Sequence, residues 1–219
     1  MNSMQSPSPK LPLALGALVL LALSASAISP YDRGTWLLEV APVLIALPVL
    51  AWTWQRFPLT PLLYWLIAAH ALVLILGGAY TYARVPLGDW MREAFHLARN
   101  PYDKLGHFMQ GLVPALVSRE ILLRGRHVAG RRMAGFLSVC VALAISAFYE
   151  LIEWWTALAL GGGAIDFLGT QGDPWDTQSD LFLALIGATL GLLLLGRWQD
   201  RQIARLAGHR VEGTTPCNI

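Results

Sequence analysis

The sequence predicts an all-α, polytopic membrane protein built as a bundle of about six transmembrane helices. Of the 219 residues, 55% are hydrophobic and only 14% are charged, whereas charged residues make up about 25% of an ordinary soluble domain. Apolar runs of about 18 or more residues are long enough to cross a bilayer as helices. The runs cover residues 11–28, 36–54, 61–82, 105–123, 133–155 and 181–198. The length suits one domain, 11–198, with a cytoplasmic C-terminal tail at 199–219.

The first three runs follow a polar N-terminal tail. Residues 1–10 are rich in Ser and Pro, so we expect a disordered cytoplasmic segment. Run 11–28 resembles a signal peptide with a cleavage box at 25–27, but its length favours an uncleaved spanning helix. Glu39 lies about one turn inside the second run, which contains two prolines, and His70 lies near the middle of the third.

Lysine and arginine are distributed unevenly between the two sides of this topology. Eleven of the 16 basic residues fall on one side: Lys10, Arg56, Arg119, Arg124, Arg126, Arg131, Arg132, Arg197, Arg201, Arg205 and Arg210. Because basic residues favour the cytoplasmic side, we expect both termini in the cytoplasm. The acidic stretch between the fifth and sixth runs, which includes Asp166, then faces outward.

An amphipathic helix is expected at 88–100, between the third and fourth runs. At 100° per residue its apolar and polar side chains separate onto opposite faces, Trp90 and Phe95 on one and Asp89, Arg92 and His96 on the other. Such a helix lies flat on a membrane surface or packs on the bundle.

Three polar stretches are predicted to meet at the outer end of the bundle, at the start of the fourth run, the end of the fifth and the start of the sixth. The candidate pocket residues are Asp103, Lys104, His107, Gln110, Glu150, Glu153, Asp173, Asp176 and Asp180. Ionisable side chains in membrane helices face a bundle interior or a wet cavity and mark function. Spacings of three and four residues place several of them on shared helix faces.

Structural roles explain some of these residues equally well. Asn100 and Pro101 have the pattern of a helix start, where an acid such as Asp103 favours the helix dipole. Asp173 and Pro174 repeat that pattern. His107, Glu150 and Asp180 are harder to explain in this way, because each lies inside or at the edge of an apolar run.

These motifs resemble a known family. The stretches YDKLGHFMQGLVPAL, FYELIEWW and LGTQGDPWDTQSDLFLALIGA identify the chain as a member of the YjdF family of bacterial inner-membrane proteins. More distantly, the pattern is similar to the VanZ-like proteins, although Glu153 and Ala184 depart from it. The resemblance implies a multi-pass inner-membrane protein without an established activity.

Several chemistries stay open for the polar pocket. His107, Glu150 and Asp180 offer ligands that suit a divalent metal, although no His-Glu-x-x-His or paired Cys-x-x-Cys signature is present. The same residues would serve a metal-dependent hydrolase of a lipid-linked substrate, a proton- or ion-coupled transporter, or a site that binds an envelope ligand. Haem between His70 and His107 is disfavoured, because the two histidines lie at different depths.

The partners expected from the sequence are the lipid bilayer and an envelope or lipid-linked ligand. The net charge of +2 gives no indication of nucleic acid binding. Gly187 and Gly191 form a small-residue face that packs within the chain or between copies in a homo-oligomer.

Overall fold

The computed structural model describes residues 8–160 and 172–211, and every regular element in this part of the chain is a helix. The glycine-rich turn 161–163 and Asp166 lie outside the described residues. The helices are α1 (Lys10–Ser26), α2 (Arg33–Thr53), α3 (Pro61–Tyr80), α4 (Pro86–Ala94), α5 (Tyr102–Arg124), α6 (Arg131–Leu160) and α8 (Asp176–Val211). The predicted all-α class is confirmed.

Four of these helices are long and apolar enough to cross a membrane: α2, α3, α6 and α8. Helix α1 is apolar but has only 17 residues, and α5 carries charged side chains in its first and last turns. Length and composition therefore support four of the six predicted spans, and the count of six stays a prediction.

Large apolar side chains cover the outside of the described bundle, as contact with lipid tails requires. Leu193 and Leu194 on α8 are 71% and 72% exposed, and Trp52 on α2 is 70% exposed. In water such a surface would be a large apolar patch. The pattern is that of a polytopic membrane bundle.

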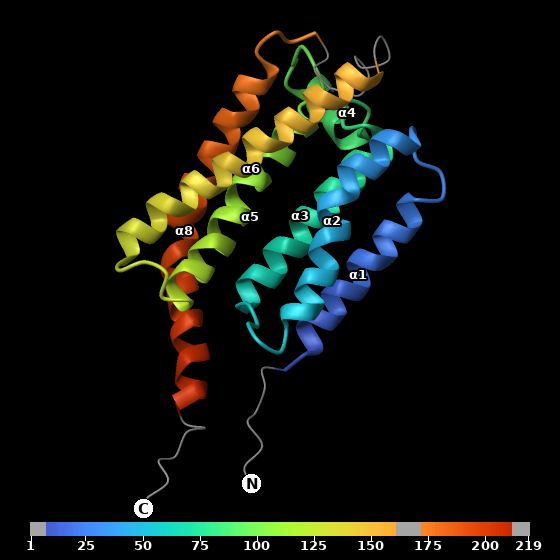
Figure 1. Ribbon diagram of the computed structural model, residues 1–219. Coiled ribbons are helices and arrows are strands. Elements are labelled where there is room, and N and C mark those ends of the chain that lie inside the picture. The colour runs from blue at the N-terminus through green and yellow to red at the C-terminus, as the bar shows by residue number, and fades with distance from the viewer. Residues whose placement is uncertain (1–7, 161–171, 212–219) are drawn as a thin grey trace, which may run out of the picture.

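The helices form two groups joined through α3 (Figure 1). Helices α1 and α2 both pack on α3, while α5 packs on α6 and α8, with α5 and α8 sharing the most extensive interface. Packing of α3 against α5 joins the groups. Figure 1 also shows that α1 begins and α8 ends at the same end of the bundle, opposite α4.

Small residues explain the closeness of α5 and α8. A Cβ atom on Gly187 would lie 2.0 Å from the backbone oxygen of Phe108, and one on Gly111 would lie 1.9 Å from that of Ala184. Only glycine permits this approach of two backbones. The small-residue face predicted on the last run packs within the chain.

The predicted amphipathic helix at 88–100 is wrong in its extent, because α4 ends at Ala94. His96 adopts a φ of 52°, a left-handed conformation that cannot continue an α-helix. Pro101 also disfavours helical backbone at the residue before it. The Asn100 side chain instead accepts a hydrogen bond from the Tyr102 amide at 3.0 Å, so the next helix begins one residue later than the sequence pattern indicated.

Three helices extend beyond the apolar runs from which they were predicted. Helix α5 begins at Tyr102, α6 reaches Leu160, and α8 runs from Asp176 to Val211. The apolar run marks the part of a helix that lipid can cover, whereas the hydrogen-bonded backbone continues through polar residues on either side. As a result Asp176 and Asp180 lie on α8 itself, inside its first two turns.

Candidate functional site

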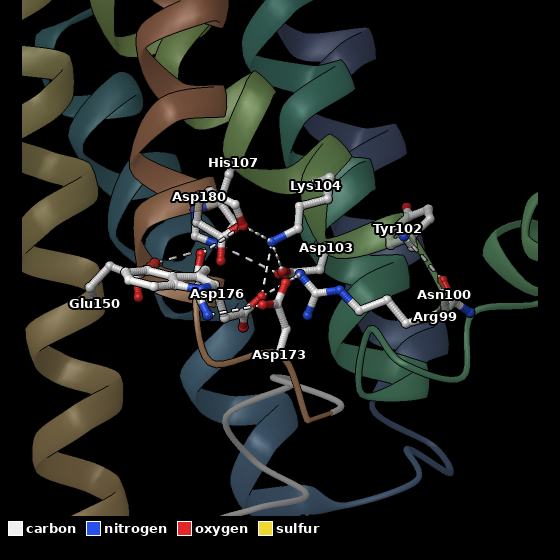
Figure 2. Close-up of polar contacts among 12 residues, drawn as sticks. Arg99, Asn100, Tyr102, Asp103, Lys104, His107, Glu150, Asp173, Asp176 and Asp180 are labelled. Carbon is white, nitrogen blue, oxygen red and sulfur yellow. Dashed lines mark hydrogen bonds and ion pairs between the residues drawn. The ribbon is translucent and has the colours of Figure 1, made fainter. Parts of the chain in front are cut away.

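Three helices bring polar side chains together at the end of the bundle that carries α4. Asp103, Lys104 and His107 come from the first turns of α5, Glu150 from the second half of α6, and Asp176 and Asp180 from the first turns of α8 (Figure 2). We call these six residues the polar cluster. His107 is 5% exposed, Glu150 9% and Asp180 1%, whereas Asp103 and Lys104 are partly buried, so the cluster is buried at its centre.

The imidazole of His107 is surrounded by three carboxylates. Its Nε2 atom lies 3.4 Å from Oδ1 of Asp103, 3.7 Å from Oε1 of Glu150 and 3.7 Å from Oδ2 of Asp180. Asp103 shares the α5 face with His107, as the four-residue spacing predicted. The other two acids arrive from α6 and α8.

Lys104 supplies a positive charge on the other side of Asp180. Its Nζ atom donates hydrogen bonds to Asp180 Oδ1 at 2.5 Å, to Ser179 Oγ at 2.6 Å and to Asp176 Oδ1 at 2.9 Å. Asp180 therefore turns one carboxylate oxygen to Lys104 and the other to His107. Lys104 is the main electrostatic link between α5 and α8 within the polar cluster.

Arg99 and Asp173 form the rim of the polar cluster. Arg99 pairs with Asp176 and lies 3.3 Å from Oδ2 of Asp173. Burial lowers the pKa of the Arg99 guanidinium, but the hydrogen bond and charge of Asp176 outweigh burial and leave that pKa raised. Asp173 also accepts a hydrogen bond from the Trp175 amide at 2.9 Å, so it holds the turn before α8, the structural role that its sequence pattern allowed.

Three residues of the polar cluster lie close enough together to hold a metal ion. Asp103, His107 and Asp180 each offer a ligand atom, and the three atoms lie within 4.8 Å of one another. This group contains Asp103, whereas we expected Glu150 beside His107 and Asp180. His107 Nδ1 and Glu150 Oε1 are buried and make no hydrogen bond with the described residues.

Gln110 and Glu153 lie outside the polar cluster and line a neighbouring cavity of about 360 Å³. Helices α2, α3, α5 and α6 surround this cavity, and Asp103 and His107 line it as well. The predicted pocket residues are thus divided between a cluster and a cavity that share two side chains.

Sequence reasoning missed two tyrosines that line the cavity, Tyr82 and Tyr149. Tyr149 donates a hydrogen bond of 2.6 Å to Oε2 of Glu39 and so links α6 to α2. Its position directly before Glu150 was the only available signal. His70 also lines the cavity, and its Nε2 is buried without a hydrogen-bond partner among the described residues.

A second polar network, at the opposite end of α5, also escaped prediction. Glu120 is fully buried and accepts hydrogen bonds from the amide and hydroxyl of Thr60, at 3.0 and 2.7 Å, and from Arg124 at 2.6 Å. Arg119 donates to Gln199 at 2.9 Å and to Asp200 at 2.7 Å. Every charge in this network is paired, which indicates a structural role in joining α5 to α3 and α8.

Comparison with known proteins gives a family for the chain. A family model described as "Predicted membrane protein (DUF2238)" matches residues 11–201. The "Inner membrane protein YjdF" of Escherichia coli (strain K12) is 62% identical over 185 residues, which cover 84% of this chain and 88% of that protein.

No solved structure matches the chain, and the comparisons give no support to the more distant VanZ-like resemblance. The family model and the relative both cover most of the sequence, and the range of the family model includes Asp103, Glu150 and Asp180. The chain therefore belongs to the YjdF family of membrane proteins, described as DUF2238.

Proposed function

We propose that this is a multi-pass inner-membrane protein that binds a divalent metal ion at its outward-facing end, through Asp103, His107 and Asp180. The name of its relative from Escherichia coli supports the inner membrane. The basic residues support an orientation with both termini in the cytoplasm, because most of them fall at that end. An envelope ligand would reach the site from outside and bind at the metal.

The distances around His107 carry the proposal. In a tetrahedral site with metal–ligand bonds of about 2.0 to 2.2 Å, neighbouring ligand atoms are about 3.3 to 3.6 Å apart. The three carboxylate oxygens lie 3.4, 3.7 and 3.7 Å from His107 Nε2. These separations are longer than good hydrogen bonds and close to the edges of such a tetrahedron.

The surrounding residues fit a bound metal. Asp180 keeps Oδ2 toward His107 while Lys104 holds Oδ1 at 2.5 Å, which orients the carboxylate as a partner outside the ligand shell does. Glu150 Oε1 is buried without a hydrogen bond among the described residues and lies 3.7 Å from His107 Nε2, so it adds a negative charge beside the three ligands. A divalent ion would also offset a negative excess, since the polar cluster holds four carboxylates and one lysine.

A bound metal polarises an oxygen of its ligand and lowers the pKa of bound water. This is the chemistry that the hydrolase alternative requires. A transporter would instead use the acids and His107 as proton carriers, without a metal. Metal dependence is therefore the property that separates the two alternatives.

The test is elemental analysis of the detergent-purified protein, followed by chelation and thermal melts with Zn²⁺, Mn²⁺ or Mg²⁺. We expect about one metal ion per chain and a melting temperature that rises when the ion is restored. His107→Asn and Asp180→Asn should abolish both effects. His96→Asn is the matched control, because His96 is an exposed histidine outside the cluster.

The proposal fails if the wild-type protein retains no metal and no ion shifts its melting temperature. The polar cluster would then be a set of polar contacts that join α5, α6 and α8. Equal metal retention by wild type and His107→Asn would equally place the metal elsewhere.

A further inference from the structure

The cavity of about 360 Å³ between the two helix groups has an elongated lining. On α2 the lining runs from Glu39 to Leu50, eleven residues at 1.5 Å each, or about 16 Å. On α5 it runs from Asp103 to Val117. The long axis of the cavity therefore follows the helices, and the cavity has the volume of a small-molecule site.

The two ends of the cavity differ in chemistry. Glu39, Asp103 and Glu153 gather at the end near the polar cluster, whereas Val49, Leu50 and Val117 lie toward the other end. A long cavity with one polar and one apolar end matches a molecule with a head and a chain. Water molecules at the apolar end would have few hydrogen-bond partners, so water alone is a poor occupant of that end.

The ionisable side chains at the polar end of the cavity are acidic. Three carboxylates line the cavity and, among the described residues, no lysine or arginine does. Glu39 accepts a hydrogen bond from Tyr149, but neither Glu39 nor Glu153 forms an ion pair in the described part of the chain. Carboxylates in such surroundings are costly unless a positive charge accompanies them.

Two histidines on the wall of the cavity point to a missing partner. His107 Nδ1 and His70 Nε2 are both buried without a hydrogen bond to any described residue, and His107 is only 5% exposed. Buried polar atoms in proteins are nearly always paired. In a neutral His107 whose Nε2–H faces the carboxylates, Nδ1 is an acceptor, and a ligand head at the polar end can donate a hydrogen bond to it.

We propose that this cavity binds a single-chain amphiphile with a protonated amine head. The amine lies among Glu39, Asp103 and Glu153, and the chain extends between α2 and α5 toward Val49 and Val117. An anionic head would meet three carboxylates, and a neutral head would leave Glu39 and Glu153 without a counter-charge. The inference goes beyond the proposed metal site, shares only Asp103 and His107 with it, and requires no metal.

The experiment uses an alkylamine probe of twelve carbons, a length that spans about 16 Å when extended, with a photoreactive diazirine at the chain end. The full-length protein is labelled in maltoside detergent after chelation with EDTA, and labelled peptides are mapped by mass spectrometry. We expect labels at the apolar end, in the segments containing Val49 and Val117. Unlabelled dodecylamine should compete.

Two variants and one control test the head group. Glu39→Gln combined with Glu153→Gln should reduce labelling about tenfold, since a hydrogen bond to a charged group contributes that much to binding. Ala46→Phe, which fills the lining of the cavity, should also block labelling. Glu93→Gln on α4, an exposed acid, should label like wild type, and size-exclusion profiles check that every variant is folded.

The comparison of head groups decides the ligand class. A probe with the same chain and a carboxylate head should not label these segments. Equal labelling by the two probes, or labels scattered over the lipid-facing surface, would overturn the proposal. Competition by lysophosphatidylethanolamine as well as dodecylamine would place the source among membrane lipids, and competition by dodecylamine alone would indicate a free amphiphilic amine.

The outcome is independent of metal binding, because the protein is metal-free throughout. Labelling without metal retention in the earlier test would support the cavity and reject the metal site. Metal retention without labelling would support the metal site and reject the ligand proposed for the cavity.

Discussion

The ammonium of Lys104 lies 2.5 Å from Oδ1 of Asp180. The two residues belong to different helices, and Asp180 is 1% exposed. A buried carboxylate with a single close cation depends on that cation, because removal of either partner leaves the other without its counter-charge. Lys104 also pairs with Asp176, but Asp176 keeps Arg99 as a second cation, so the loss of Lys104 falls mainly on Asp180.

The first prediction follows from this pair. Lys104→Met and Asp180→Asn should each lower the melting temperature in detergent, and the double variant should be less damaging than the sum of the two. The expected coupling is about 0.5 to 3 kcal/mol, the range for residues in direct contact. The matched control is Asp89→Asn with Arg92→Met, an exposed ion pair on α4 at 3.4 Å, which should show little coupling. Full additivity at Lys104 and Asp180 would contradict the contact.

The second prediction concerns the contact between α5 and α8. Gly187→Ala should destabilise the protein by about 1 to 3 kcal/mol, as overpacking does, because the added Cβ meets a backbone oxygen at 2.0 Å. Leu193→Ala, at a position 71% exposed, should change the melting temperature little. Equal melting temperatures for the two variants would show that the helices do not meet through this face.

The third prediction concerns the opposite end of α5. Glu120→Ala should cost on the order of 3 to 5 kcal/mol, the usual loss when one partner of a buried pair is removed. It leaves Arg124 and the Thr60 hydroxyl without their acceptor. Glu93→Ala on exposed α4 is the control, and thermal melts monitored by circular dichroism give the comparison. A small change at Glu120 would mean that water reaches this end and replaces the carboxylate.

The fourth prediction is topological. With Cys140 and Cys217 replaced by Ser, single cysteines at Trp175→Cys and His127→Cys should react with an impermeant maleimide from opposite sides of the membrane. Trp175 precedes α8 and His127 follows α5, and both are exposed. Periplasmic labelling at 175 and cytoplasmic labelling at 127 is the expected result. Labelling of both from one side would refute the orientation and the outward-facing site with it.

Sequence patterns were informative wherever a structural feature depends on neighbours along the chain. The four-residue spacing placed Asp103 and His107 on one face, and apolar runs located α2, α3, α6 and α8. The polarity of the run ends also indicated that α5, α6 and α8 share an end. Each of these inferences uses helix geometry alone.

Contacts between distant segments were beyond such reasoning. Tyr149 and Glu39 are 110 residues apart, and Thr60 and Glu120 are 60 apart; no local pattern relates them. The division of the expected pocket into a polar cluster and a cavity depends on how the two helix groups pack. The end of α4 depends on the left-handed backbone at His96, which its amphipathic pattern did not indicate.

Helix α5 depends on a part of the chain that is synthesised after it. Lys104 takes its carboxylate partners Asp176 and Asp180, and Arg119 takes Asp200, from α8, the last described helix. While the chain is still being made, Lys104 and Arg119 lack these acids, although Glu120 and Arg124 of α5 can already pair with each other. A chain truncated after α6 would therefore lose more than one helix, because α5 would also lose its most extensive interface and the counter-charges of Lys104 and Arg119.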